Sequence, residues 1–276
     1  MAFMRYLTFL YVQSCAVLLF AQPGGGSPAL RQASQLDVEG KYAEAREIFQ
    51  KEIDTAATPR AKANAQRALA MSYAFGGNCK KTGELEQMVI DYWVTQEKAE
   101  PKNAFYQQGE MANEAARVCI DAGDLDAAER WYKLGTELGL KEPEISADRT
   151  ALWKFRLAHA QARLAARRKK RAEASKYVAE AKAALESMTE LRKAQDQYFP
   201  YLTGYVALYL GDYAQALADF GKANQNDAFI QCLTAETYEK LGNKEKALEY
   251  WRMAAKARSH NPPGAYAIPL ARKKLG

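Results

Sequence analysis

Histidine and cysteine are scarce in this chain. The 276-residue sequence has two histidines and four cysteines: His159, His260, Cys15, Cys79, Cys119 and Cys232. None of them has the close spacing that zinc ligands require, and no Ser or Cys stands in a recognisable catalytic arrangement with a His. The acidic residues are scattered over the outer faces of the expected helices. We therefore expect no metal, no cofactor and no enzymatic activity.

Alternating runs of Val, Ile and Thr are nearly absent, which argues against a β-sheet. Ala, Leu, Glu, Lys, Arg and Gln dominate instead, so the sequence predicts an all-α protein. Its 48% hydrophobic and 26% charged residues are typical of a folded protein rather than a disordered one. The net charge of +6 is too small for this length to indicate a nucleic-acid partner.

The first residues have the pattern of an export signal. Arg5 supplies a positive charge, Tyr6 to Phe20 form an apolar run, and Ala21 is a cleavage point. We expect residues 1–21 to be a signal peptide, 22–27 a flexible linker and 28–275 a single domain. The protein would then be periplasmic or secreted; the alternative is an uncleaved or lipid-attached anchor.

Three cysteines remain after cleavage, and two of them flank expected helix turns. Cys79 follows Gly76-Gly77, and Cys119 precedes Gly123. Because equivalent turns of stacked hairpins lie side by side, Cys79 and Cys119 are a candidate disulfide. The alternative is Cys119 as a small core residue and Cys79 as a surface thiol.

A pattern of small and bulky residues recurs along the chain and predicts about six stacked antiparallel helix hairpins, an α-solenoid. Residues 144–199 lack glycine and proline, but one helix of that length would leave its apolar face unpartnered, so we expect two helices, about 145–166 and 171–192, turning near 167–171. A short helix over 265–275 would cap the stack. The recurrences are Gly40/Tyr42/Ala45/Phe49, Gly123/Leu125/Ala128/Tyr132/Gly135, Gly211/Tyr213/Ala216/Phe220/Ala223 and Gly242/Ala247/Trp251/Ala254.

These four matches resemble the tetratricopeptide-repeat (TPR) family. Their variable helix lengths are similar to those of its exported members in bacterial envelopes. The resemblance implies a non-enzymatic scaffold that binds a protein or peptide in the concave groove formed by the first helix of each hairpin. Counting the family's groove positions onto this sequence, and following the tyrosines of the fifth unit, gives the candidate ligand-binding residues Asn64, Arg67, Asn113, Arg117, His159, Arg163, Tyr198, Tyr201, Tyr205 and Tyr209.

The four tyrosines of that set lie along one helical face. They could grip an extended peptide or a sugar; the alternative is that they pack against neighbouring helices. Together with the arginines they make the groove basic and aromatic, which favours an acidic or C-terminal segment as the partner.

Two further alternatives stay open. The dense basic run Arg167–Arg171 is best interpreted as a solvated turn, the alternative being contact with an anionic membrane or glycan surface. The whole chain could instead be a structural or oligomerising module whose groove is filled by its own tail or by a second copy; a glycan-binding protein or an enzyme is less favoured.

Overall fold

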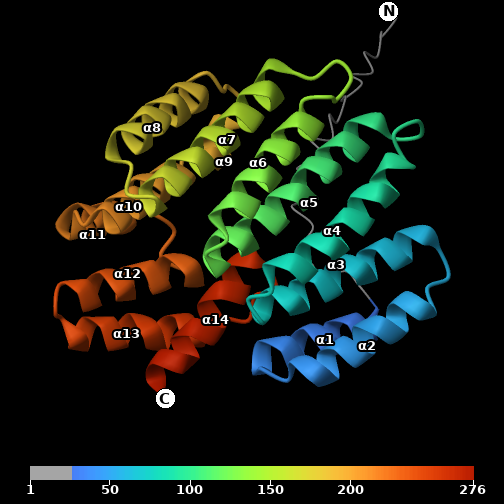
Figure 1. Cartoon of the computed structure of the whole chain (residues 1–276), viewed down its shortest axis with the longest axis horizontal. Helices are drawn as coiled ribbons and strands as arrows, with labels where there is room; N and C mark the ends of the chain where they lie inside the picture. Colours follow the sequence, from blue (N-terminus) through green and yellow to red (C-terminus); the bar gives the residue numbers. More distant parts are fainter. Residues whose placement is uncertain (1–26) are drawn as a thin grey trace, which may run out of the picture.

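The computed structural model describes residues 27–276, and Figure 1 shows that this part of the chain consists of helices and loops, without strands. The all-α prediction is confirmed. No helix within 27–276 is both long and apolar enough to cross a membrane. The predicted signal peptide and most of the linker lie outside the described residues. The helices are α1 (Pro28–Glu39), α2 (Tyr42–Asp54), α3 (Pro59–Phe75), α4 (Cys79–Val94), α5 (Pro101–Ala122), α6 (Leu125–Gly139), α7 (Ala147–Arg167), α8 (Arg171–Glu186), α9 (Arg192–Gln195), α10 (Tyr198–Leu210), α11 (Tyr213–Phe220), α12 (Ala228–Lys240), α13 (Lys244–Ala255) and α14 (Pro262–Leu275).

Consecutive helices pack in pairs: α1 with α2, α3 with α4, α5 with α6, α7 with α8, α10 with α11 and α12 with α13. Glycine ends the first helix of several pairs. Gly40, Gly123 and Gly211 have φ of 88°, 89° and 94°, the left-handed conformation that glycine adopts without strain. Asp124, the residue after Gly123, accepts a hydrogen bond from the backbone N–H of Ala127 at 2.9 Å and so caps α6.

The recurring small and bulky residues fill the interior between the paired helices. Gly204 shows why size matters there, since a Cβ at this position would lie 2.6 Å from the ring of Phe220. One small and one bulky position of each second helix in the pattern are buried, at no more than 3% exposure: Ala45, Ala128, Ala216 and Ala247 as small residues, and Phe49, Tyr132, Phe220 and Trp251 as bulky ones.

The segment without glycine or proline does turn at the expected place, between α7 and α8. The second helix is shorter than predicted, however, and ends at Glu186 instead of 192. The carboxylate of Asp148, near the start of α7, accepts hydrogen bonds from the backbone N–H groups of Thr189 and Leu191 at 3.0 and 2.8 Å. These side-chain bonds replace helical ones and hold the chain in a turn.

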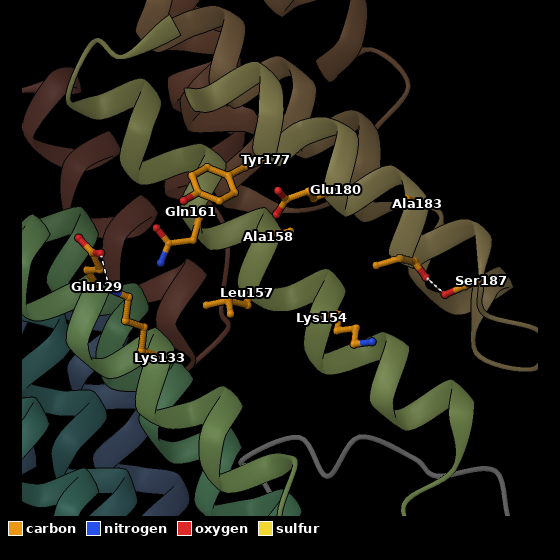
Figure 2. A pocket seen from close by; sticks show the side chains of 11 residues that line it. Glu129, Lys133, Lys154, Leu157, Ala158, Gln161, Tyr177, Glu180, Ala183 and Ser187 are labelled. Atoms are coloured by element: carbon orange, nitrogen blue, oxygen red, sulfur yellow. Dashed lines mark hydrogen bonds and ion pairs between the residues drawn. The ribbon is translucent and has the colours of Figure 1, made fainter. Parts of the chain in front are cut away.

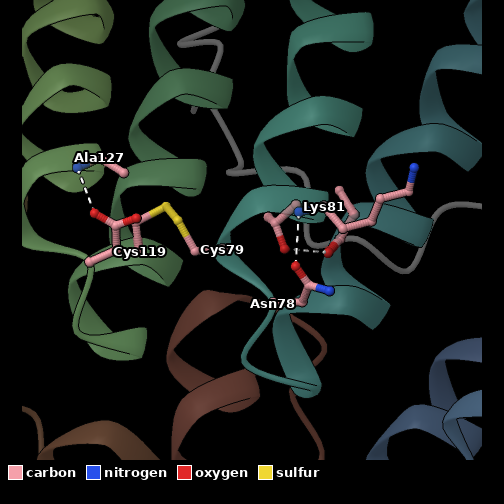
Figure 3. Close-up of a disulfide and its surroundings, with 8 residues drawn as sticks. Asn78, Cys79, Lys81, Cys119 and Ala127 are labelled. Carbon is pink, nitrogen blue, oxygen red and sulfur yellow. Dashed lines mark hydrogen bonds between the residues drawn. A yellow bond between two sulfur atoms is a disulfide. The ribbon is translucent and has the colours of Figure 1, made fainter.

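A disulfide joins the start of α4 to the last turn of α5 (Figure 3). Cys79 and Cys119 have an S–S distance of 2.02 Å and are separated by 40 residues in the sequence. The remaining described cysteine, Cys232, is a buried free thiol. The bond therefore links two neighbouring helix pairs covalently.

The last helix contacts more than the helix pair that precedes it. Besides α12 and α13, α14 packs against α3 and α5, so the chain closes on itself, and in Figure 1 α14 lies between the first and the last helix pairs. Ile268 of α14 is fully buried in a cluster with Val38 and Phe75. Arg272 also donates to the backbone carbonyl of Val38.

The loop before α14 fixes this closure through a buried histidine. His260 lies between the rings of Phe49 and Phe75, with centroids 5.8 and 5.3 Å away, and its Nε2 is 2.8 Å from Oδ2 of Asp37. The other oxygen of Asp37 accepts from the hydroxyl of Ser72 at 2.7 Å. Both members of the His–Asp pair are buried, so the contact between residues 223 positions apart is part of the interior.

Candidate functional site

Arg163 lies in the last two turns of α7 and is held by tyrosine hydroxyls. It donates to Tyr201 of α10 at 3.0 Å and to Tyr132 of α6 at 2.8 Å. Its guanidinium is also near the faces of both rings, at 5.7 and 5.4 Å from their centroids. Only 5% of the residue is exposed, and its Nε is buried without a hydrogen-bond partner among the described residues.

Arg167 follows one turn later on the same face of α7. It donates to Tyr205 at 3.3 Å and is 3.5 Å from the hydroxyl of Tyr209, both on α10. Burial opposes charge on this guanidinium, but the two tyrosines and Asp121 more than compensate and raise its pKa above the ordinary arginine value. Both arginines therefore stay cationic.

Neither Arg163 nor Arg167 forms an ion pair with a carboxylate among residues 27–276. Other inward arginines do: Arg67 pairs with Glu114, and Arg156 pairs with Glu110. Nearly buried positive charge without a counterion within ion-pair distance is costly unless something compensates for it. The tyrosine hydroxyls solvate these two cations but leave their charge unneutralised.

Two carboxylates face the same interior without closing an ion pair. Asp121 of α5 interacts electrostatically with Arg163, Arg167 and Arg117, and burial raises its pKa to about 7. Glu236 of α12 also has its pKa raised by burial. Asp121 and Glu236 thus interact electrostatically with arginines of α7, although neither forms an ion pair with them. We call Arg117, Asp121, Arg163, Arg167, Tyr209, Glu236 and Tyr266 the inner cluster.

The predicted site residues divide into two groups. Arg117, Arg163, Tyr201 and Tyr209 do come together around the inner cluster. Tyr205 is also there but is completely buried, so it acts through its hydroxyl bond to Arg167 and does not offer a surface. For this ring the packing alternative describes the structure better than the groove interpretation.

The other predicted residues lie elsewhere or are used in packing. Asn64 is exposed on α3, and Arg67 is paired with Glu114. Asn113 is buried at the contact between α5 and α6, where its side chain would be 2.7 Å from a Cβ at Gly135. Tyr198 is 41% exposed at the start of α10.

His159 is buried one turn before Arg163. Its Nε2 is 3.3 Å from the carbonyl of Tyr198, which can only accept, so this nitrogen carries the proton. Burial lowers its pKa well below the ordinary value, and Arg163 lowers it further. The ring is therefore neutral and hydrogen-bonded to backbone, the arrangement of a packed histidine.

Sequence reasoning missed Asp121 and Glu236. The signal for Asp121 was present: Arg117 is a counted groove position, and Asp121 follows it by four residues, one turn further along the same face. The same extension from Arg163 gives Arg167. For Glu236 the sequence offered no comparable signal.

The basic run at the α7–α8 turn is largely neutralised. Arg168 pairs with Glu129 and Asp126 at 2.6 Å each, and Arg171 pairs with Asp212 at 2.6 Å. Lys170 pairs with Glu173, and Lys169 donates to a backbone carbonyl of α10. These contacts support the interpretation as a solvated turn that ties neighbouring hairpins together.

An open groove of about 630 Å³ lies between α6 and α8, on the side of α7 that faces away from Arg163 and Arg167 (Figure 2). Small apolar side chains form its floor, and charged side chains of both signs lie at its rim. No described segment covers it. Its lining includes Glu129 and Lys133 of α6, Lys154, Leu157 and Ala158 of α7, and Tyr177, Glu180 and Ala183 of α8.

Within 27–276 no three His, Cys, Asp or Glu side chains gather as a metal site would need. No protein-family model matches the chain, and no curated protein is similar to it in sequence.

Proposed function

We propose that the chain is a TPR-like α-solenoid of six helix hairpins that acts as a non-enzymatic scaffold for a protein or peptide. The packing of consecutive helices in pairs supports this, as does the burial of the same small and bulky positions in four of the six pairs. In this interpretation α1, α3, α5, α7, α10 and α12 line the concave side, where the inner cluster lies.

The partner we propose is an acidic or C-terminal segment, bound on the concave side by Arg117 and Arg167, with the buried Arg163 adding positive charge behind them. The observation that carries this proposal is the pair of inward arginines that tyrosine hydroxyls hold while no described carboxylate pairs with them. A ligand carboxylate would supply the missing counterion, and guanidinium groups bind carboxylates in a favourable, often bidentate geometry. Arg117 is exposed on α5 and offers a first point of contact.

Calorimetric titration with defined peptides tests this proposal. The probes are an octapeptide rich in Glu and Asp with a free C-terminal carboxylate, its C-terminally amidated form, and a form with Gln and Asn in place of the acids. We expect the acidic peptides to bind, with affinity falling as salt rises. Arg117→Gln together with Arg167→Gln should weaken binding at least tenfold.

The matched control is Arg252→Gln, which removes an exposed arginine from α13. It should leave the affinity unchanged. Failure of both acidic peptides to bind, or equal affinity of the wild type and the double variant, would rule out the proposed site. A preference for the free carboxylate over the amide would identify the C-terminus as the recognised group.

The second candidate function is a structural module whose concave side is closed by its own tail. The packing of α14 against α3 and α5 favours it. Under this alternative the acidic peptides do not bind, and light scattering shows whether the full chain assembles into oligomers.

We also propose that the protein is exported, to the periplasm or the cell exterior. The disulfide between Cys79 and Cys119 supports this because such bonds persist in oxidising compartments. Mass spectrometry of the protein after expression with its N-terminus would identify the cleavage point. An intact N-terminus on protein recovered from the cytoplasm would contradict export.

A further inference from the structure

A cavity of about 180 Å³ lies where α14 returns to the first half of the chain. It opens between the C-terminal ends of α3 and α5 and the N-terminal half of α14, and we call it the α14 cavity. It exists because α14 packs on α3 and α5. Its lining is Ala74, Phe75, Gly77, Val118, Asp121, Ala122, Pro262, Ala265, Tyr266 and Pro269.

The walls of the α14 cavity are apolar apart from two side chains. The hydroxyl of Tyr266 donates to Glu236 at 2.8 Å, so its proton is already engaged. The carboxyl group of Asp121 has no hydrogen-bond partner among residues 27–276, so this acidic side chain of the lining is free to accept a hydrogen bond. The wall is firm on the other side, because Phe75 stacks on His260, which Asp37 fixes.

The size of the cavity suits a six-membered ring. An apolar cavity of roughly 150 Å³ in another protein holds benzene, so about 180 Å³ is ample for a ring with one substituent. A ring would contact Phe75, Val118 and Pro269, and a donor on its edge could reach the carboxyl group of Asp121. Three arginines near Asp121 disfavour an ammonium group, so a neutral O–H or N–H is the better donor.

We propose that the α14 cavity is a side-chain subsite that takes an aromatic ring bearing a neutral hydrogen-bond donor, as in the phenol of tyrosine. The subsite adjoins the arginines of the inner cluster. If the proposed function holds, the partner is an acidic segment that carries such a residue close to its recognised carboxylate. The assignment of a partner segment rests on that function, whereas the chemistry of the cavity does not.

Small probes test the subsite without any peptide. Phenol, anisole and benzene are titrated into the full chain and followed by nuclear magnetic resonance of the labelled protein. Phenol has the donor, anisole has the same ring with only an acceptor, and benzene has neither. We expect phenol to bind about tenfold more tightly than anisole, as befits a hydrogen bond to a carboxylate.

Two variants locate the effect. Asp121→Asn should abolish most of the preference for phenol over anisole while benzene still binds. Ala122→Phe, at an exposed position of the lining, should block all three probes. Its matched control is Ala218→Phe, an exposed alanine on α11 that is outside the lining, which should leave binding unchanged.

The pH dependence supplies a separate readout. The charged and titratable groups that interact with Asp121 come from its own helix and from four others: Arg117 on α5, Arg163 and Arg167 on α7, Tyr201, Tyr205 and Tyr209 on α10, Glu236 on α12 and Tyr266 on α14. Deprotonation makes the carboxyl group a stronger acceptor. The phenol preference should therefore rise between pH 6 and pH 8 in the wild type and stay flat in Asp121→Asn.

Equal affinities for phenol and anisole, or unaltered phenol binding by Ala122→Phe, would overturn the proposed subsite. The two proposals fail separately. Phenol binding with no acidic-peptide binding would remove the scaffold function and keep the subsite, whereas peptide binding with no phenol preference would do the reverse.

Discussion

The inner side of the molecule has two regions that position arginines differently. In the first, which we call the ion-paired region, Arg67 of α3 and Arg156 of α7 each form an ion pair with a glutamate of α5. In the second, the tyrosine region, Arg163 and Arg167 of α7 bind hydroxyls of α6 and α10. The residue type is the same, but in the second region no described carboxylate lies within ion-pair distance of the arginines.

This difference separates a stabilising role from a recognition role. An arginine paired with a carboxylate joins two helices and has little charge left for a ligand. An arginine held by neutral hydroxyls is equally well positioned and keeps its charge. We therefore expect ligand binding at the tyrosine region, and we expect the ion-paired region to contribute mainly to stability.

The largest expected effect comes from the disulfide that joins α4 to α5. The bond closes a loop of about 40 residues, so its loss in Cys79→Ala plus Cys119→Ala should lower the free energy of unfolding by about 4 kcal/mol. Urea denaturation measures this, and reduction of the wild type should reproduce it. Cys232→Ala, which removes a buried thiol that is outside any disulfide, should cost clearly less. An equal loss from the control would mean that the bond contributes nothing specific.

The second prediction compares the two regions directly. Glu110→Gln removes the counterion of Arg156, whose side chain is only 15% exposed, and should cost about 2–3 kcal/mol. Tyr201→Phe removes one neutral hydroxyl from Arg163, which still has Tyr132, and should cost about 1 kcal/mol. Urea unfolding of both variants gives the order. A reversed order would show that the tyrosine region, and not the ion-paired one, carries the stability.

The sequence predicted local features well because they depend on residues close together in the chain. The helix boundaries around Gly40, Gly123 and Gly211 follow from the conformational freedom of glycine, and the buried alanines follow from their spacing. The return of α14 to α3 and α5 could not be read in this way. It depends on the small rotations that accumulate over all the helix pairs, and Asp37 and His260 give no hint in sequence that they meet.

The candidate site was predicted in part for the same reason. Counting along α5 and α7 located Arg117 and Arg163, and one more turn of the same count gives Asp121 and Arg167. What the count could not give was which arginines find a carboxylate. Arg67 on α3 and Arg163 on α7 are both counted groove positions, yet one meets Glu114 and the other meets tyrosines. That choice depends on the neighbouring helix.

A third carboxyl group in the ion-paired region, that of Glu86, should affect stability in a pH-dependent way. Its effect on the melting temperature is expected to be smallest at acidic pH. Glu86 of α4 is completely buried, and both its oxygens lack hydrogen-bond partners among the described residues by distance and angle. Burial raises its pKa well above the ordinary value, and the charge of nearby Glu114 raises it further, while Arg67 opposes the shift. The folded state therefore holds a proton that the unfolded chain releases once the pH exceeds about 4.5.

The contribution of Glu86 to the free energy of unfolding therefore falls as the pH rises. Glu86→Gln replaces it with a neutral side chain of the same shape, so the variant and the wild type should have nearly equal melting temperatures at pH 4.5. The variant should become progressively more stable than the wild type from pH 5 to pH 8, because it has no proton to retain. Calorimetric scans across that range measure the difference, with Glu84→Gln on the exposed side of the same helix as the control that should show no such trend. A difference that stays constant with pH would mean that Glu86 is ionised in the folded protein and is stabilised by Arg67, which would add it to the ion-paired set.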